Sequence, residues 1–190
     1  MKTRDSGMPD STLWDSFFDP RRTLRELGLK PEHRHAADFG CGYGTFAIPA
    51  AAIISGNVYG FDIDPAMAAA TNIRARMRGL TNVIIEVRDF MANGTGLGAN
   101  GVDFAMLFNI LHAESPGIIL AEAKRILAPG GTLALMHWNY DPATPRGPSM
   151  AIRPKPEQCR QWAAEAGFVP QSLPVIPLPP WHYGITFLRP

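Results

Sequence analysis

The chain has 190 residues, and its 18 lysines and arginines against 17 aspartates and glutamates give a formal net charge of +1. This length suits one domain with its own core, and the near-neutral charge argues against a polyanion-binding surface or a polybasic membrane anchor. Glycine and proline number 18 each, about 19% of the chain against a usual ~12%. Because 46% of residues are hydrophobic and only 18% charged, this excess does not indicate disorder. The two cysteines, Cys41 and Cys159, are too few for a disulfide scaffold or a thiolate metal site.

The start of the chain and its apolar runs bear on localisation. Residues 1–10 are polar and lack the apolar core of a secretory signal. The longest strongly apolar run, residues 46–55, contains Pro49 and is far shorter than the ~20 residues of a membrane span. We therefore expect a soluble, cytoplasmic protein without a transmembrane helix.

Apolar residues at helical spacing predict two short helices within residues 13–29, interrupted at Asp19-Pro20. Strand-like and helix-like segments then alternate from residue 35 to residue 138. We expect strands at residues 35–39, 57–61, 82–87, 102–108 and 132–138, and helices at residues 45–54, 65–78 and 116–127.

The remaining segments are predicted as loops and late elements. Four glycines within residues 91–101 predict a loop, and residues 128–131 predict a turn. Residues 139–156 hold five prolines and little periodicity, so we expect a long connection there. A helix at 157–166 and two strands near 171–176 and 183–188 complete the chain. The alternation predicts one α/β domain over residues 1–190, with a mainly parallel sheet covered on both faces.

Open α/β sheets bind ligands at the carboxyl ends of their strands. The first strand runs into DFGCGYG, in which Asp38 precedes Gly40, Cys41, Gly42 and Gly44. Closely spaced glycines let the chain turn sharply and let a ligand approach backbone amides.

The next two strands end in acidic residues. The second ends at Asp62, whose carboxylate can accept hydrogen bonds from both hydroxyls of a ribose. The third ends at Asp89-Phe90, suited to an exocyclic amine and a flat ring. Together these residues predict a nucleoside pocket.

Each feature also has a purely structural interpretation. The glycines can serve a tight turn, Asp62 and Asp64 can cap the helix that begins at Pro65, and Asp89 can be a solvated turn residue. The pocket would be absent only if all three structural interpretations held at once, in three consecutive strand–helix units. This requirement makes the structural interpretations less convincing than the pocket.

Two cofactor classes compete for the pocket. A dinucleotide fingerprint places its third glycine where this sequence has Thr45, one residue beyond Gly44. The carboxylate of Asp38 beside the loop disfavours a pyrophosphate and favours a ligand that carries positive charge. S-adenosylmethionine carries both a sulfonium and an ammonium group, so the charge argument favours it.

The stretches DFGCGYGTFAIPAA, VYGFDIDPAM, VRDF and RILAPGGTLAL resemble the ordered motifs of class I S-adenosylmethionine-dependent methyltransferases. The similarity covers about residues 35–138 and is greatest to the small-molecule branch that includes ubiquinone/menaquinone C-methyltransferase-like proteins. The resemblance implies a Rossmann-like, seven-stranded, mostly parallel sheet with an antiparallel last strand. It divides the chain into N-terminal helices (1–34), a cofactor-binding core (35–138) and a substrate-side C-terminal part (139–190).

The same resemblance implies roles for particular residues. Asp62 would hold the ribose and Ile63 would pack on the adenine. Asp89 and Phe90 would contact the adenine amine and ring, and Asn109 would lie beside the methionine moiety. The methionine-binding loop would consist of Asp38, Gly40, Gly42 and Gly44, with Cys41 a small filler within it rather than a nucleophile.

Methyl transfer from a sulfonium depends on proximity and alignment, so no acid–base pair is obligatory, although a hydroxyl or thiol acceptor must lose a proton. His112 and His137 are the candidate bases, and Tyr140 and Trp138 are candidates for the acceptor pocket. Packing roles remain open for all four.

Residues 141–156 carry Arg146, Arg153 and Lys155. We predict that this segment covers the acceptor and that Arg146 and Arg153 hold an anionic group of a small molecule. A solvated connection is the alternative. In the family the N-terminal helices supply the other wall of this pocket.

Some functions are disfavoured. The fourth strand continues Asn-Ile-Leu-His rather than the Asn-Pro-Pro-Tyr of enzymes that methylate adenine or glutamine nitrogens, and basic residues form no stripe with aromatics. We expect no nucleic-acid partner, no membrane partner and no metal. The prediction is a methyltransferase for a small-molecule acceptor. A non-catalytic S-adenosylmethionine sensor and a dinucleotide-dependent oxidoreductase are the alternatives.

Overall fold

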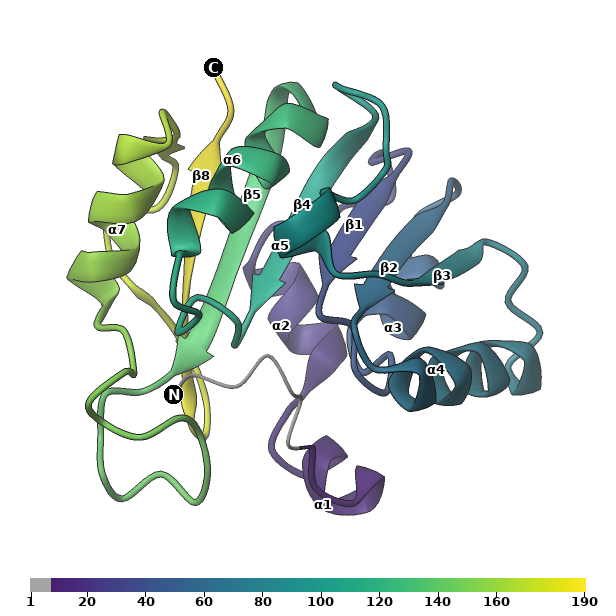
Figure 1. Cartoon of the computed structure of the whole chain (residues 1–190), viewed down its shortest axis with the longest axis horizontal. Coiled ribbons are helices and arrows are strands. Elements are labelled where there is room, and N and C mark those ends of the chain that lie inside the picture. The colour runs from purple at the N-terminus through teal and green to yellow at the C-terminus, as the bar shows by residue number, and fades with distance from the viewer. Residues whose placement is uncertain (1–7) are drawn as a thin grey trace.

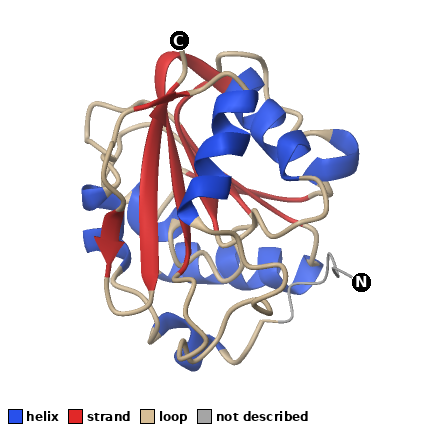
Figure 2. Cartoon of the chain, turned by 90° about the vertical axis from the view of Figure 1, so that its left-hand side faces the viewer, coloured by secondary structure: helices blue, strands red, loops and turns tan. Residues whose placement is uncertain are grey.

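The computed structural model describes residues 8–190, so most of the polar start considered above, residues 1–7, lies outside it. One twisted sheet is covered by helices on both faces (Figures 1 and 2). The elements are α1 (Ser11–Asp15), α2 (Pro20–Glu26), β1 (Ala36–Phe39), α3 (Ala47–Ala51), β2 (Val58–Asp62), α4 (Pro65–Met77), β3 (Val83–Val87), α5 (Phe90–Asn93), β4 (Val102–Phe108), α6 (Pro116–Ile126), β5 (Leu127–Trp138), α7 (Pro156–Glu165), β6 (Val169–Pro170), β7 (Ile176–Leu178) and β8 (His182–Leu188).

The strand order is β3-β2-β1-β4-β5-β8-β6, with β7 paired to β8. β1 to β5 are parallel, and β8 runs antiparallel to β5, which confirms the predicted mostly parallel sheet with an antiparallel last strand. The described chain has eight strands rather than seven, because the late strand expected near 171–176 is replaced by the short strands β6 and β7.

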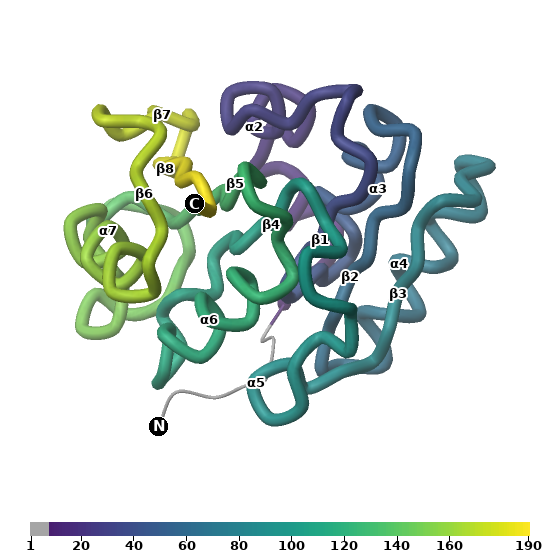
Figure 3. Tube along the Cα trace, turned by 90° about the horizontal axis from the view of Figure 1, so that it is seen from above, coloured from purple at the N-terminus to yellow at the C-terminus, as the bar shows by residue number. Residues whose placement is uncertain are grey.

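Side chains alternate between two cores. Phe104 and Met106 of β4 pack with α2 and α3, whereas Ala105 and Leu107 face α6 and β8. Seen from above, α2 and α3 lie on one side of the sheet and α5, α6 and α7 on the other (Figure 3). The predicted cover on both faces is therefore confirmed.

Two segments differ from expectation for identifiable reasons. Residues 91–101 are not all loop: α5 forms at their start because the Asp89 carboxylate caps it, accepting bonds from the amides of Met91 and Ala92 at 3.1 Å each. Residues 128–131 are part of β5, because Gly130 and Gly131 exchange backbone hydrogen bonds with Arg189 at 2.8 and 3.0 Å.

The order of the strands reverses between β1 and β4, which neighbour each other at the centre of the sheet. A crevice at the carboxyl ends of these strands is where α/β sheets bind ligands. In Figure 1 these ends point toward α1 and toward the long connection after β5. No helix within residues 8–190 is long and apolar enough to cross a membrane.

Candidate active site

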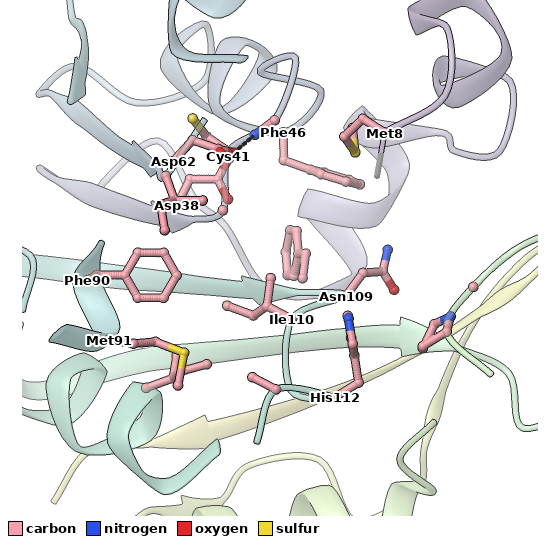
Figure 4. A pocket seen from close by; sticks show the side chains of 18 of the residues that line it. Met8, Asp38, Cys41, Phe46, Asp62, Phe90, Met91, Asn109, Ile110 and His112 are labelled. Atoms are coloured by element: carbon pink, nitrogen blue, oxygen red, sulfur yellow. Dashed lines mark hydrogen bonds between the residues drawn. The ribbon is translucent and has the colours of Figure 1, made fainter. Parts of the chain in front are cut away.

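A cavity of about 610 Å³ lies at the carboxyl ends of β1, β2 and β4. Ten of the residues that the sequence proposed for cofactor or catalysis line it: Asp38, Gly40, Cys41, Gly42, Asp62, Ile63, Asp89, Phe90, Asn109 and His112. Figure 4 shows that side chains from separate strand ends converge on this space.

The glycine loop runs under one end of the cavity. Gly40 and Gly42 have φ of +74° and +53°, values that L side chains rarely adopt. A Cβ at Gly40 would lie 3.1 Å from Ile110 Cγ2, and one at Gly42 would lie 3.1 Å from Met8 Cε. The bare backbone therefore leaves room on the cavity side of the loop.

Asp62 connects this loop to the end of β2. Its Oδ2 accepts a hydrogen bond from the Gly42 amide at 2.8 Å, and its Oδ1 accepts one from the Asp64 amide at 3.0 Å. The helix-capping role belongs to Asp64, whose Oδ1 accepts from the Ala66 amide at 2.8 Å. Asp62 is thus held at the cavity wall by the glycine loop, and capping does not account for it.

Two acidic groups are buried side by side at this end. Asp38 is 2% exposed and Asp62 5% exposed, and they lie on the paired strands β1 and β2. Burial, with the charge of Asp62 in addition, raises the pKa of Asp38 to about 7, and burial also raises the pKa of Asp62. Within residues 8–190 neither carboxylate forms an ion pair with a basic side chain. A positively charged ligand would supply the missing compensation.

Flat and apolar side chains line the next part of the wall. Phe90 projects toward the cavity (Figure 4) and is braced by an edge-to-face contact with Phe39 at 5.2 Å. Ile63, at the end of β2, is 39% exposed and also lines the cavity. Met91 and Ile110 line it as well. These last two residues were not predicted from the sequence, since neither belongs to a polar motif.

Asn109 follows β4 with φ of +57°, an unusual value for a side-chain-bearing residue. Its amide donates to the Met136 carbonyl at 2.8 Å, whereas its side-chain Oδ1 is buried and has no hydrogen-bond partner. A buried acceptor without a partner costs free energy until a donor arrives. Asn109 lies across the cavity from Asp38 and Asp62 (Figure 4), so a ligand between them could supply that donor.

Two residues of the loop have mainly structural roles. Gly44 does not line the cavity, and a Cβ there would lie 2.6 Å from Thr71 Cγ2. Its φ of +74° and tight packing serve the turn into α3. The Cys41 side chain is buried close to Gly60, and burial raises the pKa of its thiol, as suits a filler rather than a nucleophile.

The two predicted histidines form a pair of which His112 alone lines the cavity. His112 Nδ1 lies 3.4 Å from Nε2 of His137. His137 is 2% exposed, and burial, followed by the neighbouring His112, holds its pKa well below the usual value. His137 is therefore neutral and stands behind His112 rather than in contact with a ligand.

The far end of the cavity is largely aromatic. Trp14, Phe46, Phe108 and Trp138 line it together with Met8 from the N-terminal segment. The sequence predicted Trp138 and a wall from the N-terminal helices, and Trp14 of α1 belongs to that wall. Phe46 and Phe108 were missed, because an aromatic residue that also packs in the core has no distinguishing pattern.

Three other residues predicted to contact a ligand lie in the connection after β5, and only one of them lines the cavity. Arg146 lines the cavity, whereas Tyr140 and Arg153 do not. Tyr140 is 44% exposed and lies beneath the Lys155 ammonium at 4.7 Å. For these two residues the structure corrects the expectation of direct ligand contact.

Arg153 instead folds the connection onto itself. Arg153 is 7% exposed, and its guanidinium donates to the carbonyl oxygens of Asn139, Asp141, Arg146 and Pro148 and to the Thr144 hydroxyl. These bonds hold residues 139–148 together, and Arg146, Gly147 and Pro148 of this segment line the cavity. Within residues 8–190 no group of three or more His, Cys, Asp or Glu side chains could hold a metal ion.

Comparison with known proteins agrees with this geometry. Residues 37–135, just over half of the chain, match the family model described as "Methyltransferase domain". The chain belongs to this family. This family is the type 11 branch of the class I methyltransferases, which use S-adenosylmethionine as the methyl donor.

Individual relatives are more distant. An uncharacterised 37.1 kDa protein from a transposon of Streptomyces fradiae is 32% identical over 120 residues, which is 62% of this chain. The present chain spans about a third of that relative, since the match covers 34% of it.

Among solved structures, an S-adenosylmethionine-dependent methyltransferase from Aquifex aeolicus superposes with a TM-score of 0.83 at 24% identity, over 95% of this chain and 94% of that one. Geranyl diphosphate C-methyltransferase from Streptomyces coelicolor gives a TM-score of 0.73 at 16% identity, over 94% and 77% of the two chains. These likenesses establish the shared methyltransferase fold.

Proposed function

We propose that this protein transfers the methyl group of S-adenosylmethionine to a small molecule. The observation that carries the proposal is the continuity of the cavity. One hollow joins the glycine loop, Asp38 and Asp62 to the aromatic end with His112. A protein that only sensed S-adenosylmethionine would have no need of the second compartment.

The residues at the loop end fit the cofactor. Two buried carboxylates without a basic partner among residues 8–190, a loop of bare backbone and the orphaned Oδ1 of Asn109 match a ligand with ammonium, sulfonium and hydroxyl groups. In this arrangement Asp38 and Asn109 hold the methionine part and Asp62 binds the ribose. Ile63 and Phe90 enclose the adenine, and Asp89 lies beside its amine.

When bound, S-adenosylmethionine supplies a methyl group on a positively charged sulfur, which an electron pair of the acceptor displaces in line. The protein contributes alignment and exclusion of water. Trp14 and Trp138 line the acceptor side, and the connection held by Arg153 closes it. His112 is placed to take a proton from the acceptor through its Nε2, because its Nδ1 faces His137.

Isothermal calorimetry tests the donor half of this proposal. We expect saturable binding of S-adenosylmethionine and S-adenosylhomocysteine and no binding of NAD. Affinity for NAD alone would contradict the assignment and favour the oxidoreductase.

Domain limits of 35–138 for the cofactor core and 139–190 for the acceptor side form part of the proposal.

A further inference from the structure

The cavity carries opposite charges at its two ends. Asp38, Asp62 and Asp89 lie at the glycine-loop end, whereas Arg146 lines the wall at the aromatic end. Arg88, beside Asp89, also lines the cavity, but its guanidinium pairs with Glu86 at 3.4 Å. Arg153 lies next to that wall, and its Nη2 donates to the Arg146 carbonyl oxygen at 3.3 Å. The donor site is thus acidic and the acceptor site basic.

The charge on Arg153 has no paired carboxylate within residues 8–190. Its hydrogen-bond partners are four carbonyl oxygens and one hydroxyl, all neutral. A buried cation with neutral partners leaves a positive potential around it. The effect reaches His182, which packs against Trp138 with the ring centroids 4.2 Å apart: burial lowers the pKa of His182 to about 3, and the charge of Arg153 adds to that effect.

The acidic groups nearest this end are peripheral. Asp141 belongs to the same connection and favours the charged form of Arg153, and Glu114 lines the edge of the cavity. Both side chains are exposed, where water and salt screen their charge. Arg146, by comparison, is half-buried and lines the cavity wall.

The aromatic part of the acceptor wall is tightly packed. Trp138 is 2% exposed and packs edge-on against Phe17 at 5.4 Å and Trp14 at 6.5 Å. A Cβ at Gly147 would lie 2.9 Å from Trp138 Cγ, so the connection lies directly on the indole. Phe46 and Phe108 are held edge to face at 4.7 Å. Fixed aromatic faces favour a flat ring over a flexible chain.

We propose that the acceptor combines a flat apolar ring with an anionic group, the ring packed against the aromatic wall that includes Trp14 and Trp138 and the anion bound at Arg146. This inference rests on the proposed function, because it assigns the second compartment of the same site. Arg153 acts as a positioning residue that holds the Arg146 backbone in place.

Two matched probes test the anion separately from the ring. Protein saturated with S-adenosylhomocysteine is titrated calorimetrically with 1-naphthoate and with 1-naphthalenemethanol, which share a ring but differ in charge. We expect naphthoate to bind about tenfold or more tightly, as a charge-assisted contact predicts. Arg146→Gln should abolish this difference, and Trp14→Leu should weaken both probes.

Lys155→Gln is the control, since it removes the same charge from the same connection but from a side chain outside the cavity, over Tyr140. It should keep the preference for naphthoate. Equal affinity of the two probes for the wild type, binding of neither, or a preference that survives Arg146→Gln overturns the inference. Affinity for S-adenosylhomocysteine, measured first, reports on the proposed function and should be unchanged in every variant.

Discussion

The backbone amide of Gly42 donates a hydrogen bond to Oδ2 of Asp62 at 2.8 Å, and this bond links the glycine loop to the end of the neighbouring strand. The two residues are twenty positions apart in the chain. The bond means that the shape of the loop and the position of the acidic group depend on each other. A change in the carboxylate should therefore disturb both the loop and the cofactor site.

Replacement of Asp62 by Asn tests this link. The amide side chain offers one oxygen in place of two and loses the negative charge, so one of the two backbone bonds at 2.8 and 3.0 Å must be lost. We expect affinity for S-adenosylmethionine to fall by at least about tenfold in calorimetry. Asp64→Asn, which removes a neighbouring charge but keeps an oxygen to cap α4 and both backbone bonds to Asp62, should keep the wild-type affinity. Equal losses in both variants would refute the link.

The buried Asp38 predicts a dependence of binding on pH. Its pKa is raised to about 7 by burial and by Asp62, so ionisation of Asp38 destabilises the free protein as the pH rises from about 4 through 7. A cationic ligand needs the ionised form. Affinity for S-adenosylmethionine should therefore increase about tenfold between pH 6 and pH 8.

Calorimetry at pH 6, 7 and 8 measures this dependence. Asp38→Asn serves as the control, because any titration of the ligand itself persists in this variant. The wild type should bind more tightly as the pH rises, and the variant should bind weakly with a flatter profile. Parallel profiles for the two proteins would show that Asp38 is not the titrating group.

Gly44 is predicted to matter for folding more than for binding. A Cβ there would meet Thr71 Cγ2 at 2.6 Å and Ile48 Cδ1 at 2.9 Å, and φ is +74°. Gly28 has φ of +85° with nothing within 4 Å, so it isolates the backbone cost. We expect Gly28→Ala to lower the free energy of unfolding by about 1 kcal/mol, and Gly44→Ala by about 1–3 kcal/mol more. Chemical denaturation measures the free energy of unfolding of both variants. Equal losses in the two variants would show that the packing around Gly44 can accommodate a Cβ without cost.

His112→Gln separates chemistry from cofactor binding. His112 lines the cavity, and the neutral His137 lies at 3.4 Å behind it. For an acceptor that loses a proton in the transfer step, kcat should fall about 100-fold or more. Affinity for S-adenosylhomocysteine should stay at the wild-type value. An unchanged kcat would remove His112 from the mechanism.

Local sequence signals predicted the framework well. Positions of β1 to β5 and β8 follow from apolar runs bounded by glycine or aspartate, because strand ends and turns have strong local preferences. One of the two wrong predictions depends on a distant partner, and the other on a local cap. Strand pairing of residues 128–131 requires Arg189 near the C-terminus, and α5 requires that Asp89 turn back as a cap.

The same distinction holds within the site. Asp38 and Asp62 are identifiable because a carboxylate at a strand end has few structural uses. Arg146 and Arg153 look alike in sequence, seven residues apart in a proline-rich segment. Only the folded connection shows that one lines the cavity and the other is buried among carbonyl oxygens. Phe46 and Phe108 have no signal at all, because core packing and ligand packing select the same side chains.

Methyl transfer itself is the most direct test of the account. Protein incubated with S-adenosylmethionine labelled on the methyl group and with fractionated small-molecule extracts should yield a labelled small molecule and an equal amount of S-adenosylhomocysteine. Asp62→Asn should lower both at concentrations of S-adenosylmethionine below the dissociation constant of this variant. Tight binding of S-adenosylmethionine without label in any fraction would contradict the proposed transfer and favour a sensing role.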